Sequence, residues 1–270
     1  MSRILVIGSS HAGAVKLAWD ETKDDHTGVE LDFLVLPWPH FAQLRLYDDM
    51  TYGARAPFAD EVARANALMV NGKETVNLSD YDLIFWVGYS SPVDALVRLM
   101  CNYAIDGVIR HEAKPRMSFA LFREILMEFV TECLPDDVWL NAASRPKLIV
   151  HLCPIIAETC LTVPKYQRNW HIVADNAKIF RRILALMMKR MTTRLAEHNI
   201  DVLEQPPETL AQNGMTKVKY SVGSVRLLSD EAHPENDPTH MNSIYGRLLL
   251  QRLFANLGTT TQDAADRPVS

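Results

Sequence analysis

The chain has 270 residues, of which 48% are hydrophobic and 23% are charged, so it can bury a core of good size. Its formal net charge of −5, from 28 basic and 33 acidic residues, gives no reason to expect nucleic acid or an anionic membrane as a partner. No apolar run approaches membrane-spanning length, and the run over 4–7 is too short for a signal-peptide core, so we expect a cytoplasmic protein.

Strands and helices alternate along the first half of the chain. Short apolar runs predict buried strands over 3–7, 31–36 and 82–87, and helical patterns follow over 12–19 and 93–103. Residues 68–76 predict a small hairpin around Asn71-Gly72, because Asn-Gly suits a type I′ turn.

The second half continues the alternation. Ser118 is expected to cap a helix that runs to about residue 133, and a fourth strand follows over 147–152. Asp175 is expected to cap a long helix through Glu197, with Asn199 at its end, and a short strand follows over 201–203. A last helix begins near Asn242.

This alternation predicts an α/β fold with a mostly parallel five-stranded sheet that helices cover on both faces. We expect one domain over 1–258 and a disordered polar tail over 259–270. In such sheets the ligand binds beyond the carboxyl ends of the strands, where the loops after Ile7, Val87 and Leu203 are expected to meet.

The first candidate for chemistry is the turn Gly8-Ser9-Ser10-His11, which ends a strand and opens a helix. A serine there is exposed at the sheet edge, and its own N–H can hold a developing oxyanion. The same residues also suit a plain tight turn with a serine helix cap.

The second candidate is Asp237-Pro238-Thr239-His240, just before the last helix. A serine nucleophile needs a base to take its proton, and the base needs an acceptor that fixes its tautomer. A histidine and an aspartate three residues apart can supply both, although the pair alone also fits a helix cap beside an exposed histidine.

Together the two segments resemble the SGNH hydrolases, also called GDSL-type esterases and lipases. In that family a strand leads into G-D-S and a helix, and D-x-x-H precedes the closing helix. The resemblance implies a flavodoxin-like three-layer αβα sandwich and a catalytic triad of Ser10, His240 and Asp237. It also implies hydrolysis or transfer of an acyl ester, with a small-molecule or carbohydrate ester as substrate and an acetyl group as one possibility.

The family's middle motifs are only partly present. Its G-x-N-D segment supplies an asparagine that donates to the oxyanion, whereas Ser90 stands at that position here. A glycine N–H joins the oxyanion hole in the family, and Gly53 is the matching candidate. Ser9 replaces the aspartate that usually precedes the nucleophile, but that aspartate is not the acid of the triad.

Other residues carry weaker signals. His11 is predicted to line the pocket beside Ser10, and His233 is a second possible base. Trp38 and His40 suit a surface loop better than a substrate wall. Residues 163–171, rich in aromatic and basic groups, fit a lid and an ordinary connecting loop equally well.

No metal or cofactor is expected. The histidines show no metal-ligand spacing, and the cysteines form no C-x-x-C pair, which favours reduced thiols at positions 101, 133, 153 and 160. A nucleotide-binding Rossmann-type domain is a disfavoured alternative, because Gly8 and Gly13 are spaced unlike G-x-G-x-x-G and Leu36-Pro37 stands where an acidic residue is needed.

Three functions therefore remain open. The first is a serine esterase of the SGNH type, and the second is an acyltransferase that uses the same triad. The third is a non-catalytic binding domain on the same fold, which the missing asparagine favours.

Overall fold

The computed structural model describes residues 2–141, 145–229 and 231–258. Its centre is a five-stranded sheet in the order β10-β9-β6-β1-β2, with every neighbouring pair parallel. The strands are β1 (Ser2–Gly8), β2 (Val29–Val35), β6 (Leu83–Tyr89), β9 (Lys147–Leu152) and β10 (Ile200–Val202). Counted among these five alone, the order is 2-1-3-4-5, which is the flavodoxin-like arrangement and confirms the predicted α/β class.

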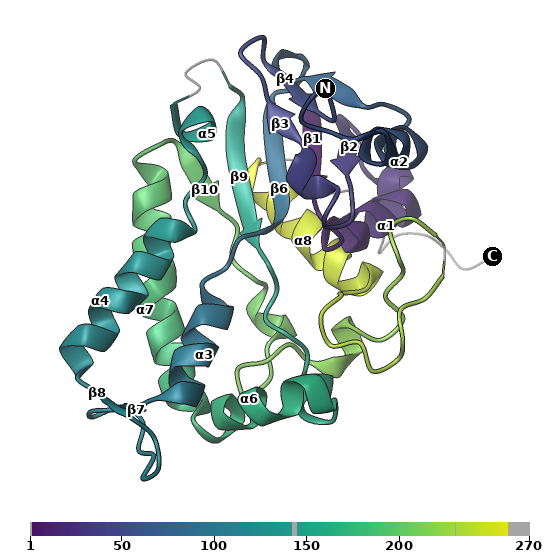
Figure 1. The fold of residues 1–270 in the computed structure, drawn as a ribbon. Coiled ribbons are helices and arrows are strands. Elements are labelled where there is room, and N and C mark those ends of the chain that lie inside the picture. Colours follow the sequence, from purple (N-terminus) through teal and green to yellow (C-terminus); the bar gives the residue numbers. More distant parts are fainter. Residues whose placement is uncertain (1, 142–144, 230, 259–270) are drawn as a thin grey trace.

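Helices cover both faces of this sheet (Figure 1). Alternate side chains of β1 divide the core: Ile4 and Val6 pack with α1 (Ala12–Thr22) and α8 (Ser243–Asn256). Leu5 and Ile7 face the opposite layer. That layer contains α2 (Glu61–Asn71), α3 (Val93–Asn102), α4 (Phe119–Glu132), α6 (Pro164–Asp175) and α7 (Ala177–Ala196).

Two small sheets and several short helices complete the described residues. An antiparallel sheet joins β3 (Arg45–Leu46), β4 (Thr51–Gly53) and β5 (Thr75–Asn77), and β7 (Ala104–Ile105) pairs with β8 (Arg116–Met117). The short helix α5 covers Asp137–Asn141. Single 3₁₀ turns lie at Lys23–Asp25, Phe41–Gln43, Leu78–Asp80, Glu158–Leu161, Pro207–Thr209 and Val218–Tyr220.

The hairpin predicted over 68–76 is wrong. Residues 68–70 are the last turn of α2, and Gly72 ends this helix in the left-handed conformation with φ of 68°. Its N–H donates to the carbonyl of Leu68 at 2.9 Å, while the Asn71 side chain exchanges hydrogen bonds with the backbone of Val35. Asn-Gly therefore serves here as a helix end, which needs the same positive φ as a type I′ turn.

Two predictions around residue 170 also need correction. The segment over 163–171 is mainly the beginning of α6, with Pro164 at its first turn, and Trp170 is buried in the core. Asp175 is the last residue of that helix, so it does not cap α7. Asn176 precedes α7 and makes no side-chain cap.

The other predicted helix ends are confirmed. Ser118 accepts a hydrogen bond from the N–H of Leu121, and Asn242 accepts one from the N–H of Tyr245. Asn199 follows α7 with φ of 56°.

The four cysteines are free thiols. Of the helices in the described ranges, none is long and apolar enough to cross a bilayer. The tail predicted over 259–270 lies outside the described residues.

Candidate active site

The serine turn follows the carboxyl end of β1. Gly8 lies so close to β6 that a Cβ there would be 2.2 Å from the carbonyl oxygen of Val87, so only glycine fits. The carbonyls of Ser9 and Ser10 accept the N–H groups of Ala12 and Gly13, and these bonds begin α1. Ser10 therefore lies at a helix N-terminus, where backbone N–H groups and the helix dipole favour negative charge.

Hydrogen bonds to other segments hold the Asp237–His240 segment and the residues after it in place before α8 begins. The carbonyl of Pro238 accepts the N–H of Ala157 at 2.7 Å. The side-chain amide of Asn242 donates to the carbonyls of Lys219 and Val222, both at 2.8 Å. These bonds hold the backbone on both sides of His240, which restricts the position of its ring.

Close packing of α8 on α1 brings the two segments together. A Cβ at Gly246 of α8 would lie 2.0 Å from the carbonyl oxygen of Ala14 in α1. The glycine thus lets the two helix backbones touch near the first turn of each. This contact places His240, which precedes α8, beside Ser10, which precedes α1.

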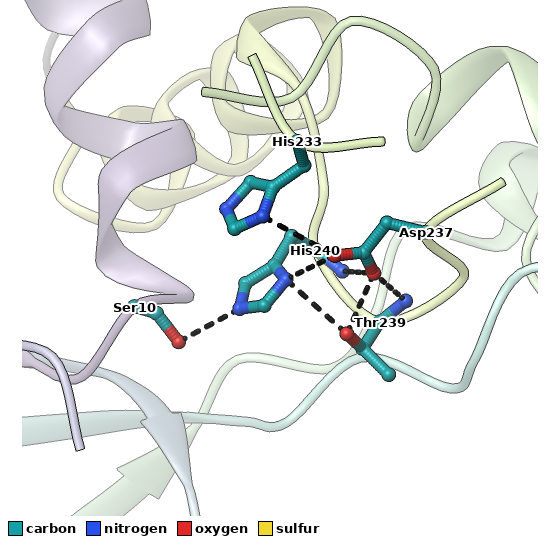
Figure 2. A network of polar contacts seen from close by, with 5 residues as sticks. All are labelled: Ser10, His233, Asp237, Thr239 and His240. Carbon is teal, nitrogen blue, oxygen red and sulfur yellow. Dashed lines mark hydrogen bonds and ion pairs between the residues drawn. The ribbon is translucent and has the colours of Figure 1, made fainter. Parts of the chain in front are cut away.

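The three predicted triad residues form a continuous hydrogen-bonded chain (Figure 2). His240 Nε2 lies 3.0 Å from Ser10 Oγ, and His240 Nδ1 lies 2.9 Å from Asp237 Oδ2. With the proton on Nδ1, His240 donates to Asp237 and accepts the hydroxyl proton of Ser10. This is the geometry that a serine nucleophile and its general base require.

Thr239 holds the aspartate and was not predicted from the sequence. Its hydroxyl and its backbone N–H both donate to Asp237 Oδ1 at 2.7 Å. Burial alone raises the pKa of Asp237, but the hydrogen bonds from His240 and Thr239 outweigh it and keep the pKa well below 3.8. The carboxylate is therefore charged at neutral pH, as the orienting acid of a triad must be.

Two more imidazoles stack against His240. The ring of His233 lies 4.0 Å away at an angle of 6°, and its Nδ1 is 3.2 Å from Asp237 Oδ2 (Figure 2). The ring of His11 lies 5.7 Å from His240 at 28°. Burial, reinforced by His240 and His151, lowers the pKa of His11 to about 4, and burial also lowers the pKa of His233.

His233, Asp237 and His240 offer one potential metal-ligand atom each, all within 4.8 Å of one another. A metal ion binds an imidazole nitrogen in the plane of its ring. The two rings are nearly parallel and 4.0 Å apart, so one ion cannot lie in both planes. As arranged here, His240 Nδ1 is hydrogen-bonded to Asp237 Oδ2, and His233 Nδ1 lies at ion-pair distance from the same carboxylate oxygen.

The structure does not bring Gly53 to the candidate site. Gly53 pairs with Thr75 in the antiparallel sheet, and Lys73, just before Thr75, forms an ion pair with Asp32. Asp32 lies opposite Leu5 in the middle of β1, five residues before Ser10. Figure 1 accordingly shows β4 near the N-terminus of the chain, at the amino end of β1.

Ser90 and His11 were both predicted to belong to the site, and the structure shows the contacts that each of them makes. The Ser90 hydroxyl donates to Cys133 Sγ at 3.5 Å, so its proton points toward the end of α4. His11 stacks on His240, and its role in lining a substrate pocket stays a prediction. Gly88, which has φ of 71°, lies against His11: a Cβ there would be 2.7 Å from His11 Cβ. Gly88 is therefore the residue after the third predicted strand that contacts the serine turn.

Comparisons with known proteins identify no family for the chain. No protein-family model matches the chain, and no curated protein matches it.

Proposed function

We propose that the protein is a serine ester hydrolase of the SGNH type. The observation that carries the proposal is the chain Ser10 Oγ–His240 Nε2 at 3.0 Å and His240 Nδ1–Asp237 Oδ2 at 2.9 Å. These residues come from the two sequence segments that resemble the family. An O-acyl ester, with a carbohydrate-linked acetyl group as one candidate, is the substrate class that the resemblance suggests.

In the proposed mechanism Ser10 Oγ attacks the ester carbonyl while His240 Nε2 takes the hydroxyl proton. The resulting imidazolium is stabilised by the charged Asp237, and it then gives the proton to the departing alcohol. Water repeats the sequence on the acyl-enzyme, with His240 again acting as base, and releases the carboxylic acid.

The oxyanion is expected to lie at the first turn of α1. Among the described residues, the backbone N–H groups of Ser10 and His11 have no protein acceptor. Two backbone donors at a helix N-terminus suit a developing negative charge. The proposal therefore needs neither Gly53, which lies elsewhere, nor the Ser90 hydroxyl, which donates to Cys133.

Labelling with a fluorophosphonate probe tests this proposal directly. We expect wild-type protein to be labelled, and we expect Ser10→Ala and His240→Ala to lose at least 99% of the labelling rate. Ser9→Ala is the matched control, because it removes the neighbouring hydroxyl from the same turn and should keep most of the rate. Folded wild type that is neither labelled nor able to hydrolyse a short-chain aryl ester would contradict the proposal.

A non-catalytic binding domain on the same fold is the second candidate. It is favoured by the position of Gly53 in the antiparallel sheet and by the Ser90–Cys133 hydrogen bond, since these leave fewer oxyanion donors than the family has. The same labelling experiment separates the two candidates. If labelling occurs, product analysis with and without an alcohol acceptor distinguishes hydrolysis from acyl transfer.

A further inference from the structure

A pocket of about 530 Å³ opens at the carboxyl edge of the central sheet, outside the triad. Its walls come from the last residues of β9, from residues that follow β6, β9 and β10, and from one side of α7. Aliphatic side chains dominate the lining: Leu152, Ile155, Leu184, Met188, Leu203 and Leu210. This volume and lining are typical of a site for a small, largely apolar ligand.

One layer of residues separates the pocket from the serine turn. Cys153 lines the pocket, and its thiol donates to the carbonyl of Gly88 at 3.2 Å. Gly88 in turn lies against His11. His151, also in the lining, is buried, with hydrogen bonds to the carbonyl of Leu203 and the hydroxyl of Tyr245. No residue of the triad lines the pocket.

The outer face of α7 is strongly basic. The helix contains no aspartate or glutamate in its 20 residues, and its exposed side chains include Lys178, Arg181, Arg182, Lys189 and Arg190. Across the described ranges, none of these five forms an ion pair with a carboxylate, although the whole chain carries a net charge of −5. A cationic stripe without counter-charges on an acidic protein points to an anionic partner.

Two of these cations stand on the rim of the apolar pocket. Arg181 and Lys189 both line it, with Ala185 between them one helical turn from each. Eight residues of helix separate the two by about 12 Å. The buried hydroxyl oxygen of Thr192, in the same lining, has no hydrogen-bond partner among the described residues. On the facing wall the exposed Glu204 is the one carboxylate of the lining.

We propose that this pocket binds an anionic amphiphile, with its alkyl chain among the aliphatic residues and its carboxylate or phosphate head on Arg181 and Lys189. The aliphatic lining accounts for the chain, and the unpaired cations on one rim account for the head group. The proposal does not rest on ester hydrolysis, since binding requires neither Ser10 nor His240.

Isothermal titration with decanoate, decyl phosphate and decanol, each below its aggregation limit, tests the proposal. We expect both anions to bind wild type at least tenfold more tightly than decanol, and their ratio shows which head group is preferred. Absence of decanoate and decyl phosphate binding, or equal binding of decanol, would overturn the proposal.

Matched charge reversals locate the site on the helix. Arg181→Glu with Lys189→Glu should weaken anion binding at least tenfold, because two attractions become repulsions. Arg182→Glu with Arg190→Glu makes the same change in charge on the same exposed face, but outside the pocket lining, and should weaken binding less than threefold. If the two double variants weaken binding equally, the effect comes from the overall charge of the helix, and the proposed binding site is wrong.

Two single variants probe the pocket itself. Ala185→Trp, at an exposed position in the lining, should block chain entry and abolish binding of all three ligands. Glu204→Gln removes the opposing carboxylate and should tighten anion binding while leaving decanol unchanged. Circular dichroism establishes that each variant is folded, and unaltered decanoate binding by folded Ala185→Trp would contradict the proposal.

Discussion

Replacing Gly246 with alanine tests how the candidate site is assembled. The new Cβ would lie 2.0 Å from the carbonyl oxygen, 2.5 Å from the carbonyl carbon of Ala14 and 2.9 Å from the nitrogen of Val15. All three are backbone atoms, so no side-chain rotation relieves the contact. Because real Cβ contacts below 3.0 Å are essentially never seen, α8 must move from α1 by about 1 Å or more.

That movement has two measurable consequences. Overpacking typically costs about 1–3 kcal/mol, and the better helix propensity of alanine returns about 1 kcal/mol, so we expect a net loss of up to about 2 kcal/mol. A shift of about 1 Å also stretches the Ser10–His240 contact from 3.0 Å beyond hydrogen-bond length. Misplacement of that size can cost about 100-fold in rate.

Gly13→Ala is the matched control, because Gly13 lies in α1 and a Cβ there meets its nearest neighbours at 3.8 Å. This variant should keep the labelling rate and gain up to about 1 kcal/mol. Urea unfolding gives the stability of each variant, and fluorophosphonate labelling gives the rate. If Gly246→Ala matches wild type in both measurements, the idea that this helix contact sets the site is refuted.

The remaining predictions concern histidines around the triad. His233→Asn keeps a polar side chain beside Asp237, whereas His233→Phe keeps only the stacked ring, so we expect the labelling rate to fall roughly tenfold in the phenylalanine variant and less in the asparagine variant; equal rates would show that the polar contact of His233 with the carboxylate is unimportant. Stability should also fall in acid, since burial lowers the pKa of both His11 and His151 from 6.5 to about 4. Between these values the unfolded chain binds more protons than the folded one, so each residue should remove about 2 kcal/mol from the free energy of unfolding between pH 7 and pH 5. Urea unfolding at the two pH values checks this, and unchanged stability would contradict the assigned burial effect.

The sheet could be predicted because its strands are apolar on both faces. The apolar runs over 3–7, 82–87 and 147–152 have no plausible place except a buried parallel sheet, and the structure puts strands there. The ends of helices were harder to predict, because the same short sequence can occur in several local structures. Asn71-Gly72 supplies a positive φ that suits a hairpin and a helix C-terminus equally, and only the contact of Asn71 with Val35 decides between them.

The contact of Ser10 with His240 and Asp237 could be predicted from the sequence, because both motifs are short and a triad requires these residue types. The predicted oxyanion roles of Gly53 and Ser90 were harder to judge from the sequence, since the position of Gly53 depends on which strand pairs with β4 and the hydroxyl direction of Ser90 depends on Cys133. His233 comes close to Asp237 in a segment where the His233 N–H donates to the carbonyl of Ser224. The spacing of residues in the sequence does not predict this approach of His233 to Asp237.

The long separation in sequence between Ser10 and His240 determines when their contact can form during synthesis of the chain. The two residues are 230 positions apart, and their contact depends on α8 packing on α1. At a synthesis rate of about 5–20 residues per second, the serine turn is made roughly ten to fifty seconds before its histidine. During translation the central strands can pair while Ser10 still lacks its hydrogen bond to His240, so this contact forms only after the segment that precedes α8 has been made.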